Sequence, residues 1–330
     1  MVKKATLADV AAHAGVSIAL VSIVLRDAPG AAPATRERVL AAAREIGYEP
    51  DRRARLLRSG RSRLLGVVFG VEHAFHGDLV TGLYEAADRQ GYELTLSGVT
   101  PHRDERRAIR SLLQDRCEAL ILLGPQAPAA ELDALAARMP VVVLARGVRR
   151  ADVDTVRTAD ADGLAQAVAH LAGLGHRRIA HVDGADAPGS ADRRRGYRTA
   201  MRRLGPAAEA RLVTGGLTEE DGARAARALL DDPPTAVTVF NDRCATGVLD
   251  ALRRAGKAVP EDISVTGFDD SRLARLGHVS LTTVAQDTAT MTEQALRRAA
   301  ARISGEPMSP REEVVPPHLV IRSTTAPPLR

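Results

Sequence analysis

The sequence predicts an α/β protein with a separate helical module at its N-terminus. Small apolar residues recur at helical spacing through residues 5–48, whereas from residue 64 short apolar runs alternate with stretches of helical length. Between them, the arginine-rich residues 51–63 lack an apolar face wide enough for a core. We therefore expect one domain at 1–50, a hinge helix or linker at 51–63 and a core at 64–330.

Residues 5–25 have the pattern of a helix-turn-helix. Thr6 is placed to cap a first helix with a small apolar face, and Gly15 follows at the turn, where a positive φ is easiest for glycine. Ser17 is placed to cap a second helix whose apolar residues keep helical spacing as far as Leu25. Small residues let two such helices cross closely, so that the second can enter a DNA major groove. Taken alone, the pattern also suits an ordinary helical hairpin.

A third helix and a basic segment follow. Pro33 suits a first helical position, and the apolar periodicity continues until Gly47 ends the helix. Residues 51–63 are too few to form a stable isolated helix. Phosphate contacts would order them as a helix with Asp51 as its N-cap. The alternative is a solvated basic linker.

The positive charge is concentrated near the N-terminus. Residues 1–63 hold 12 Lys and Arg against 6 Asp and Glu, whereas residues 64–330 hold 34 against 35. The basic pI of about 9.7 thus comes from a small part of the chain, as an electrostatic footprint for phosphates requires. Aromatic residues make up 2% of the chain and Trp is absent, which argues against base stacking by a single-strand or RNA binder. Double-stranded DNA is the expected partner.

Apolar runs predict the strands of the core. Nearly continuous apolar strands that alternate with helices indicate parallel sheets with both faces covered. The core is too long for one doubly wound sheet, so we expect two α/β subdomains, with ligands bound beyond the carboxyl ends of the strands. The predicted strands span residues 64–71, 92–99, 119–124, 141–145, 178–184, 236–241 and 264–268.

Catalytic and membrane signals are absent from the sequence. It contains no HExxH, paired CxxC, GxSxG or P-loop motif. We therefore expect no enzyme, no catalytic residue, no cofactor and no metal. Charged residues interrupt the N-terminal segment, and no run of about 18 uncharged apolar residues occurs, so neither a signal peptide nor a membrane span is expected. Together with only two cysteines, these features favour a cytoplasmic protein.

Motifs along nearly the whole chain resemble the LacI (lactose-repressor-type) family. Their order and spacing both match. The motifs are TLADVAAHAGVS from Thr6, VS at Val21-Ser22, TRERVLAAAREIGYEPD from Thr35, ARLL at 54–57, LLGVV at 64–68, LGHRRIAHVDG at 174–184, RRRGY at 193–197, FND at 240–242, VPEDISVTGFDD at 259–270 and LTTVAQD at 281–287.

The resemblance implies a helix-turn-helix domain and a periplasmic-binding-protein-like core of two subdomains, each a parallel sheet covered by helices. It places chain crossovers near Asp160, near Gln286 and after Ser309. The N-subdomain would then hold about 64–159 and 286–309, and the C-subdomain about 160–285 and 310–330.

The function implied by the resemblance is a transcriptional repressor. Such a protein would act as a homodimer on pseudo-palindromic operator DNA, under the control of a small effector such as a sugar or related metabolite. The alternative is a solute-binding protein of the periplasmic type without DNA function. The basic N-terminal module and the missing signal peptide count against that alternative.

In the core, the resemblance places effector contacts after the strands. A guanidinium at Arg193 can hold hydroxyls or a carboxylate at two points. Ala145 stands where relatives often carry Asp, which removes an acceptor for sugar hydroxyls. A strand-terminal Asn or Asp can also merely cap the next helix, and we interpret Asp242 as such an N-cap. The expected contacts are Phe75, His76, Arg146, Arg193, Asn241, Asp269 and Gln286.

In the N-terminal part, the resemblance assigns contacts to DNA. Leu57 is expected to wedge into the central base step from the minor groove, with Ala54 on the same face. Ile23 stands where Arg is frequent, and isoleucine can pack on a thymine methyl but cannot bond guanine. Alternatively, Ile18 and Ile23 are buried at a helix contact and read nothing. The expected contacts are Thr6, Ser17, Ile18, Ala19, Ser22, Ile23, Arg26, Thr35, Tyr48, Ala54 and Leu57.

Overall fold

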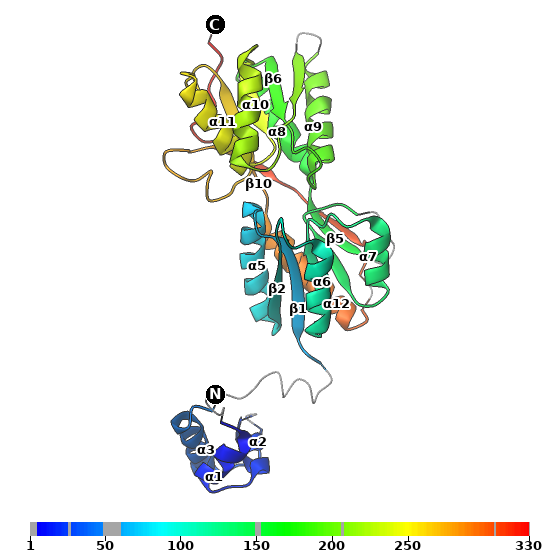
Figure 1. Ribbon diagram of the computed structural model, residues 1–330, viewed down its shortest axis with the longest axis vertical. Helices are drawn as coiled ribbons and strands as arrows, with labels where there is room; N and C mark the ends of the chain where they lie inside the picture. Colours follow the sequence, from blue (N-terminus) through cyan, green and yellow to red (C-terminus); the bar gives the residue numbers. More distant parts are fainter. Residues whose placement is uncertain are drawn as a thin grey trace. The chain divides into compact units, whose positions relative to one another are not determined.

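The computed structural model describes residues 5–25, 28–48, 61–148, 153–205, 208–306 and 308–329. The chain forms two compact units, Met1–Ser62 and Arg63–Arg330 (Figure 1). Three predicted DNA contacts, Arg26, Ala54 and Leu57, lie outside the described residues, as does most of the predicted hinge.

The first unit is a three-helix domain of α1 (Leu7–Ala14), α2 (Ile18–Leu25) and α3 (Pro33–Glu45). Thr6 and Asp9 form a capping box at the start of α1. Ser17 Oγ accepts the Leu20 amide at 3.2 Å at the start of α2, so both predicted caps are confirmed. Among the described residues, no single helix is long and apolar enough to cross a membrane, and α1 and α2, which pass that test only as a pair, are bent by 104°. The domain core is built on Val10, Val21 and Val39, which are fully buried.

The second unit contains two six-stranded sheets. The first has the order β11-β5-β4-β3-β1-β2, and all its neighbouring strands are parallel. Helices α5 (Ala74–Gln90) and α12 (Thr288–Ile303) pack in one buried apolar cluster, and α6 (Glu105–Gln114) and α7 (Ala129–Ala136) in another. The strands are β1 (Leu64–Gly70), β2 (Glu93–Val99), β3 (Ala119–Leu123), β4 (Val141–Leu144), β5 (Asp154–Thr158) and β11 (Glu312–Val315).

The second sheet has the order β12-β10-β9-β8-β6-β7 and is parallel except for the β10–β12 pair. Helices α8 (Asp160–Gly173) and α9 (Ser190–Arg203) share one buried cluster, and α10 (Glu219–Leu230) and α11 (Asp242–Arg254) share another. The predicted fold of two parallel-sheet subdomains is confirmed. The strands are β6 (Arg178–Val182), β7 (Glu209–Val213), β8 (Ala236–Val239), β9 (Ser264–Asp269), β10 (Thr282–Ala285) and β12 (His318–Val320).

The chain passes between the sheets after β5, after β10 and after β11. In Figure 1, α12 (orange) therefore lies among the cyan and green elements of the first subdomain. The third crossover was expected after Ser309, and that prediction is wrong because β11 still pairs with β5. Arg298 Nη2 of α12 donates to Glu313 of β11 at 3.0 Å and holds this strand in the first subdomain. The crossover falls instead at Pro316-Pro317, where the missing N–H groups end the ladder.

Two glycines allow α10 and α11 to cross at very short distance. A Cβ at Gly222 would overlap the carbonyl oxygen of Cys244, and a Cβ at Gly247 would overlap that of Glu219. Backbone cannot yield as a flexible side chain can, so only glycine fits at either position. The crossing fixes the start of α11, which carries several residues of the site described below.

The same substitution should therefore have opposite effects at two helical glycines. Gly222→Ala is expected to lower the free energy of unfolding by about 1–3 kcal/mol through overpacking. The control is Gly77→Ala, where a Cβ would meet nothing within 4 Å. There the free energy of unfolding should rise by up to about 1 kcal/mol through helix propensity. Urea unfolding followed by circular dichroism measures both. Equal effects would contradict the role assigned to the crossing.

Candidate functional site

The first turn of α2 is exposed to solvent. Ser17, Ile18 and Ala19 are exposed there, and 52% of Ile18 is accessible to solvent. Ile18 is therefore not buried at a helix contact and is free to touch a partner. Ser22 and Ile23, one turn further on, are half-buried, so Ile23 remains compatible with both reading and packing.

The other described DNA-contact predictions are spread over the domain. Thr6 is exposed at the α1 N-cap, and Thr35 is half-buried in the first turn of α3. Tyr48 is half-buried and packs against the domain core. The three residues come from different segments of the domain, as expected for backbone contacts at several points along a duplex.

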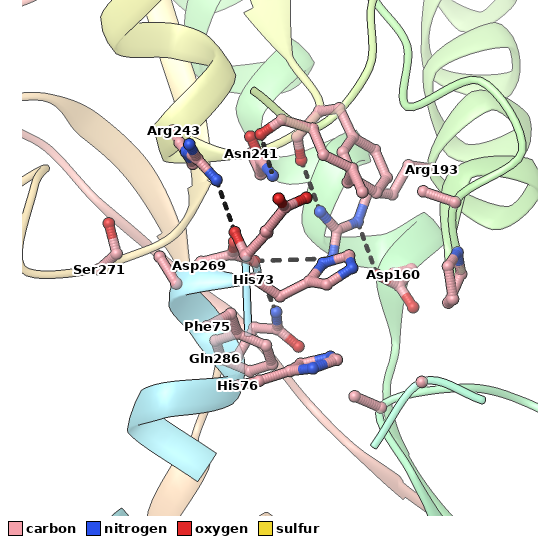
Figure 2. A pocket seen from close by; sticks show the side chains of 18 residues that line it. His73, Phe75, His76, Asp160, Arg193, Asn241, Arg243, Asp269, Ser271 and Gln286 are labelled. Carbon is pink, nitrogen blue, oxygen red and sulfur yellow. Dashed lines mark hydrogen bonds and ion pairs between the residues drawn. The ribbon is translucent and has the colours of Figure 1, made fainter. Parts of the chain in front are cut away.

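A small cavity lies between the two subdomains of the second unit. Its free volume is about 60 Å³, far below the roughly 300 Å³ at which ligand pockets begin. This cavity alone is therefore too small for a sugar-sized ligand, but a hollow of about 520 Å³ that shares Asp160 and another of about 400 Å³ that shares His76 adjoin it. Six of the seven predicted effector contacts line it, namely Phe75, His76, Arg193, Asn241, Asp269 and Gln286 (Figure 2).

The seventh predicted contact, Arg146, is not brought together with these six. Its Nη1 donates to the carbonyl oxygen of Pro125. Its side chain lines a neighbouring cavity with Asp186 and Asp192, and that cavity shares Asp160 with the first. Ala145, directly before it, is the residue that faces the central cavity.

The Arg193 guanidinium occupies the centre of the cleft. Its Nε donates to Asp160 Oδ1 at 2.7 Å and its Nη1 to the Phe240 carbonyl oxygen at 2.5 Å. Its Cζ lies 3.5 Å from the centroid of the Phe268 ring and 4.5 Å from that of Phe240. Arg193 is only 6% exposed, so a carboxylate, a carbonyl and two aromatic faces replace its hydration shell.

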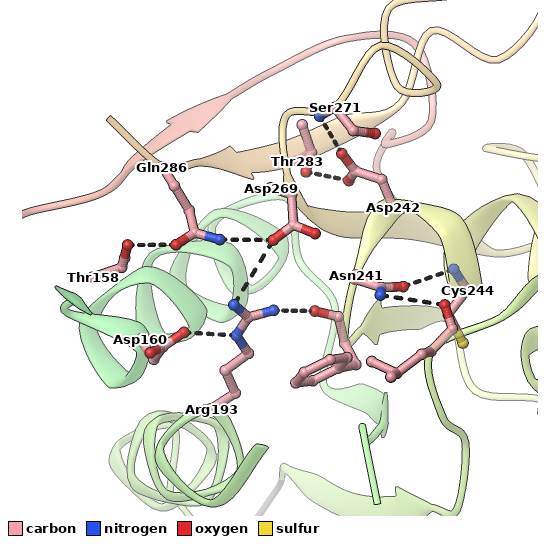
Figure 3. Close-up of polar contacts among 12 residues, drawn as sticks. Thr158, Asp160, Arg193, Asn241, Asp242, Cys244, Asp269, Ser271, Thr283 and Gln286 are labelled. Atoms are coloured by element: carbon pink, nitrogen blue, oxygen red, sulfur yellow. Dashed lines mark hydrogen bonds and ion pairs between the residues drawn. The ribbon is translucent and has the colours of Figure 1, made fainter. Parts of the chain in front are cut away.

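Asp269 connects Arg193 to the crossovers. It lies at the end of β9 with φ of 112°, a region that non-glycine residues rarely occupy. Its Oδ1 accepts from Gln286 Nε2 at 2.7 Å and lies 3.8 Å from Arg193 Nη2. Gln286 Oε1 in turn accepts from the Thr158 hydroxyl (Figure 3). Burial raises the pKa of Asp269, although the charge of Arg193 opposes the shift.

The roles of Asn241 and Asp242 differ from the prediction. Asn241, not Asp242, caps α11, because its Oδ1 accepts the Cys244 amide at 2.7 Å. Asp242 has helical geometry and is fully buried; its Oδ2 accepts the Ser271 amide at 2.7 Å and its Oδ1 the Thr283 hydroxyl at 2.5 Å. It therefore joins α11 to the segment after β9 and to β10 (Figure 3).

Two stacked histidines form part of the cavity wall. The ring centroids of His73 and His76 are 4.6 Å apart. Burial lowers the pKa of His76 to about 3, so the ring is neutral at pH 7. Its Nδ1 accepts the Gly70 amide at 2.9 Å, which places the proton on Nε2.

Sequence reasoning missed Asp160, Arg243 and Ser271 as cavity residues. Arg243 Nε donates to Glu219 at 2.6 Å, and its Nη1 donates across the cleft to the Glu72 carbonyl oxygen at 2.6 Å. The predicted crossover near Asp160 and the strand end before Arg243 were signals that could have found these two. Ser271 carries no comparable signal.

Comparisons with known proteins give a consistent result. Residues 6–51 match the family model described as bacterial regulatory proteins, lacI family, and residues 168–325 match a periplasmic binding protein-like domain. The transcriptional regulator GalR of Escherichia coli is 34% identical over 98% of this chain and 96% of its own.

Solved structures agree with these matches. A LacI transcriptional regulator from a Rhodococcus species is 54% identical, with a TM-score of 0.78 over 80% of this chain and 98% of that one. The lac repressor dimer bound to operator and the anti-inducer ONPF is 28% identical, with a TM-score of 0.83 over 98% of this chain and all of the other.

The carboxyl group of Asp242 should make stability depend on pH. Burial raises its pKa in the folded state, so its contribution to the free energy of unfolding is fully present below the pKa of the unfolded state, about 4, and is lost as the pH rises towards the pKa of the folded state. Asp242→Asn stays neutral. The difference in free energy of unfolding between Asp242→Asn and the parent should shift in favour of the variant by more than about 1 kcal/mol from pH 5 to pH 8. Urea unfolding at both pH values, with the exposed Asp232→Asn as control, measures this, and a pH-independent difference contradicts it.

Proposed function

The chain belongs to the LacI family of bacterial regulatory proteins, and from this we propose that ligand binding in the cleft between its two sheets controls the DNA affinity of its three-helix domain. As a family member it is a DNA-binding transcriptional regulator. The proposal adds a homodimer on a two-fold operator, because half-sites read by one α2 each require two copies. It also adds a cytoplasmic location without enzymatic activity.

The observation that carries the proposal is the Arg193 network. It joins groups from α8, α9, β9 and the end of β8 to Gln286 and Thr158 at the crossovers. Those crossovers are the covalent connections between the subdomains, so a ligand that engages Arg193 acts on the residues about which the subdomains turn. A cavity of about 60 Å³ must widen to admit a sugar-sized ligand. Binding therefore selects between two arrangements of the subdomains.

Arg193→Lys should uncouple the two sites. Lysine keeps a positive charge beside Asp160, but it cannot reproduce the planar fork. We expect the effect of a sugar or sugar-derivative effector on operator affinity to fall at least tenfold. Operator affinity without effector should stay within about twofold of that of the parent. Fluorescence anisotropy with an operator selected from random DNA measures both. Arg195→Lys on the exposed face of α9 is the control, and an unchanged response in Arg193→Lys refutes the assignment.

Substitution at Ile23 should change the bases that α2 reads. Ile23→Arg introduces a fork that can bond guanine O6 and N7. Selection from random DNA should then show one changed base in each half-site, with stronger guanine preference. An unchanged motif would mean that the half-buried Ile23 packs within the domain and does not read DNA.

A further inference from the structure

The hydrogen-bonding groups still available in the cleft are mostly donors. Arg193 uses Nε and one N–H of Nη1, whereas Nη2 makes no hydrogen bond and lies 3.8 Å from Asp269. His76 Nε2 carries the ring proton, because Nδ1 is occupied by the Gly70 amide. Both side chains are more than nine-tenths buried and line the cavity.

Two further donors come from the opposite wall. Arg243 uses Nε and Nη1, which leaves Nη2 for a ligand at the mouth of the cavity. Ser271 lines the cavity, and its buried hydroxyl has no hydrogen bond of good geometry within the described part of the chain, although it lies close enough to Asp242 to lower the pKa of that carboxyl group. A buried hydroxyl without a partner costs free energy unless a ligand or water satisfies it.

Several acceptors of the cavity already accept hydrogen bonds from protein donors. Gln286 uses its oxygen for Thr158 and its nitrogen for Asp269, and Asn241 uses its oxygen to cap α11. Burial favours the protonated form of Asp269, which weakens it as an acceptor. Ala145 contributes no polar side-chain atom.

Two further carboxylates line the cavity. Asp160 is paired with Arg193 at 2.7 Å. The Glu72 side chain is exposed at the cavity wall, and the Glu72 backbone carbonyl accepts from Arg243.

We propose that the ligand of this cleft is an anionic carbohydrate, whose carboxylate or phosphate oxygens lie between Arg193 and Arg243 and accept from His76 and Ser271. This rests on the effector role of the cleft proposed above. An oxyanion offers only acceptors, which matches the free donors, and guanidinium groups bind carboxylate and phosphate in the same geometry. The anion binds Nη2 of Arg243, beside the contact that Nη1 makes across the cleft with the Glu72 carbonyl.

Matched probes test the charge requirement. Isothermal titration of the full-length protein would compare D-glucose with D-gluconate and D-glucose 6-phosphate, and D-galactose with D-galactonate and D-galactose 6-phosphate. At least one acid or phosphate ester should bind ten or more times more tightly than its neutral sugar, and the preferred form identifies the anion. Inorganic phosphate alone measures binding of the free ion. A neutral sugar that binds as tightly as its anionic forms, or no binding by any probe, overturns the proposal.

Two variants separate ligand recognition from closure of the cleft. Arg243→Gln should weaken the anionic probe about 10–100-fold, as expected for a lost charge-assisted bond, and Arg243→Lys should recover part of the affinity. The control Arg254→Gln changes an exposed arginine on the same helix, which forms an ion pair with Asp250, and should bind as the parent does. If Arg243 served only to close the cleft, Arg243→Gln would change the affinity for neutral and anionic probes by the same factor, and that result also overturns the proposal.

Failure of the anionic assignment can be distinguished from failure of effector control. If a neutral sugar binds and shifts operator affinity, the anionic assignment fails while effector control stands. If an anionic sugar binds without changing operator affinity, the assignment stands and effector control fails.

Discussion

The arrangement of the cleft depends on keeping the charge of Arg193 inside the protein. A guanidinium that is 6% exposed loses most of its hydration, at a cost of several kcal/mol unless the surroundings replace it. Asp160, the Phe240 carbonyl and two phenylalanine rings supply that replacement. Because these groups come from separate segments, the charge is compensated only when α8, α9, β8 and β9 are all in place. The fold itself therefore positions the residues of the site.

The sheet topology explains why these segments meet. Parallel strands direct their carboxyl ends to one edge, and Asp269, Asn241 and Gln286 follow β9, β8 and β10 there. The close α10–α11 crossing, which glycine permits, fixes the start of α11, and Asp242 ties it to β10 and to the segment after β9. Polar groups on the first subdomain, such as His76, meet this edge from the other side.

Apolar pattern was sufficient for strands made mostly of apolar residues but not for buried strands rich in polar residues. The runs at β1, β3, β4 and β8 were found, whereas β5 and β10 were missed because their sequences, DTVRT and TTVA, are rich in polar residues. Thr282 and Thr283 of β10 are nevertheless fully buried. The Thr282 hydroxyl bonds the Thr325 hydroxyl and accepts the Arg322 amide, and the Thr283 hydroxyl donates to Asp242. Family motifs gave Arg193, Asp269 and Gln286, but which of Asn241 and Asp242 caps α11 depends on backbone angles that composition does not determine. Ser271 reaches the cleft through tertiary contacts, which local sequence does not reveal.

Reciprocal linkage tests the central claim that the cleft and the DNA-binding domain share one conformational equilibrium. Titration calorimetry would measure the affinity of the tightest-binding sugar derivative for the free protein and for the protein saturated with its selected operator. The two affinities should differ by the same factor by which that ligand changes operator affinity. Equal affinity for free and operator-bound protein would contradict the claim, because two sites that do not alter each other's binding are not coupled.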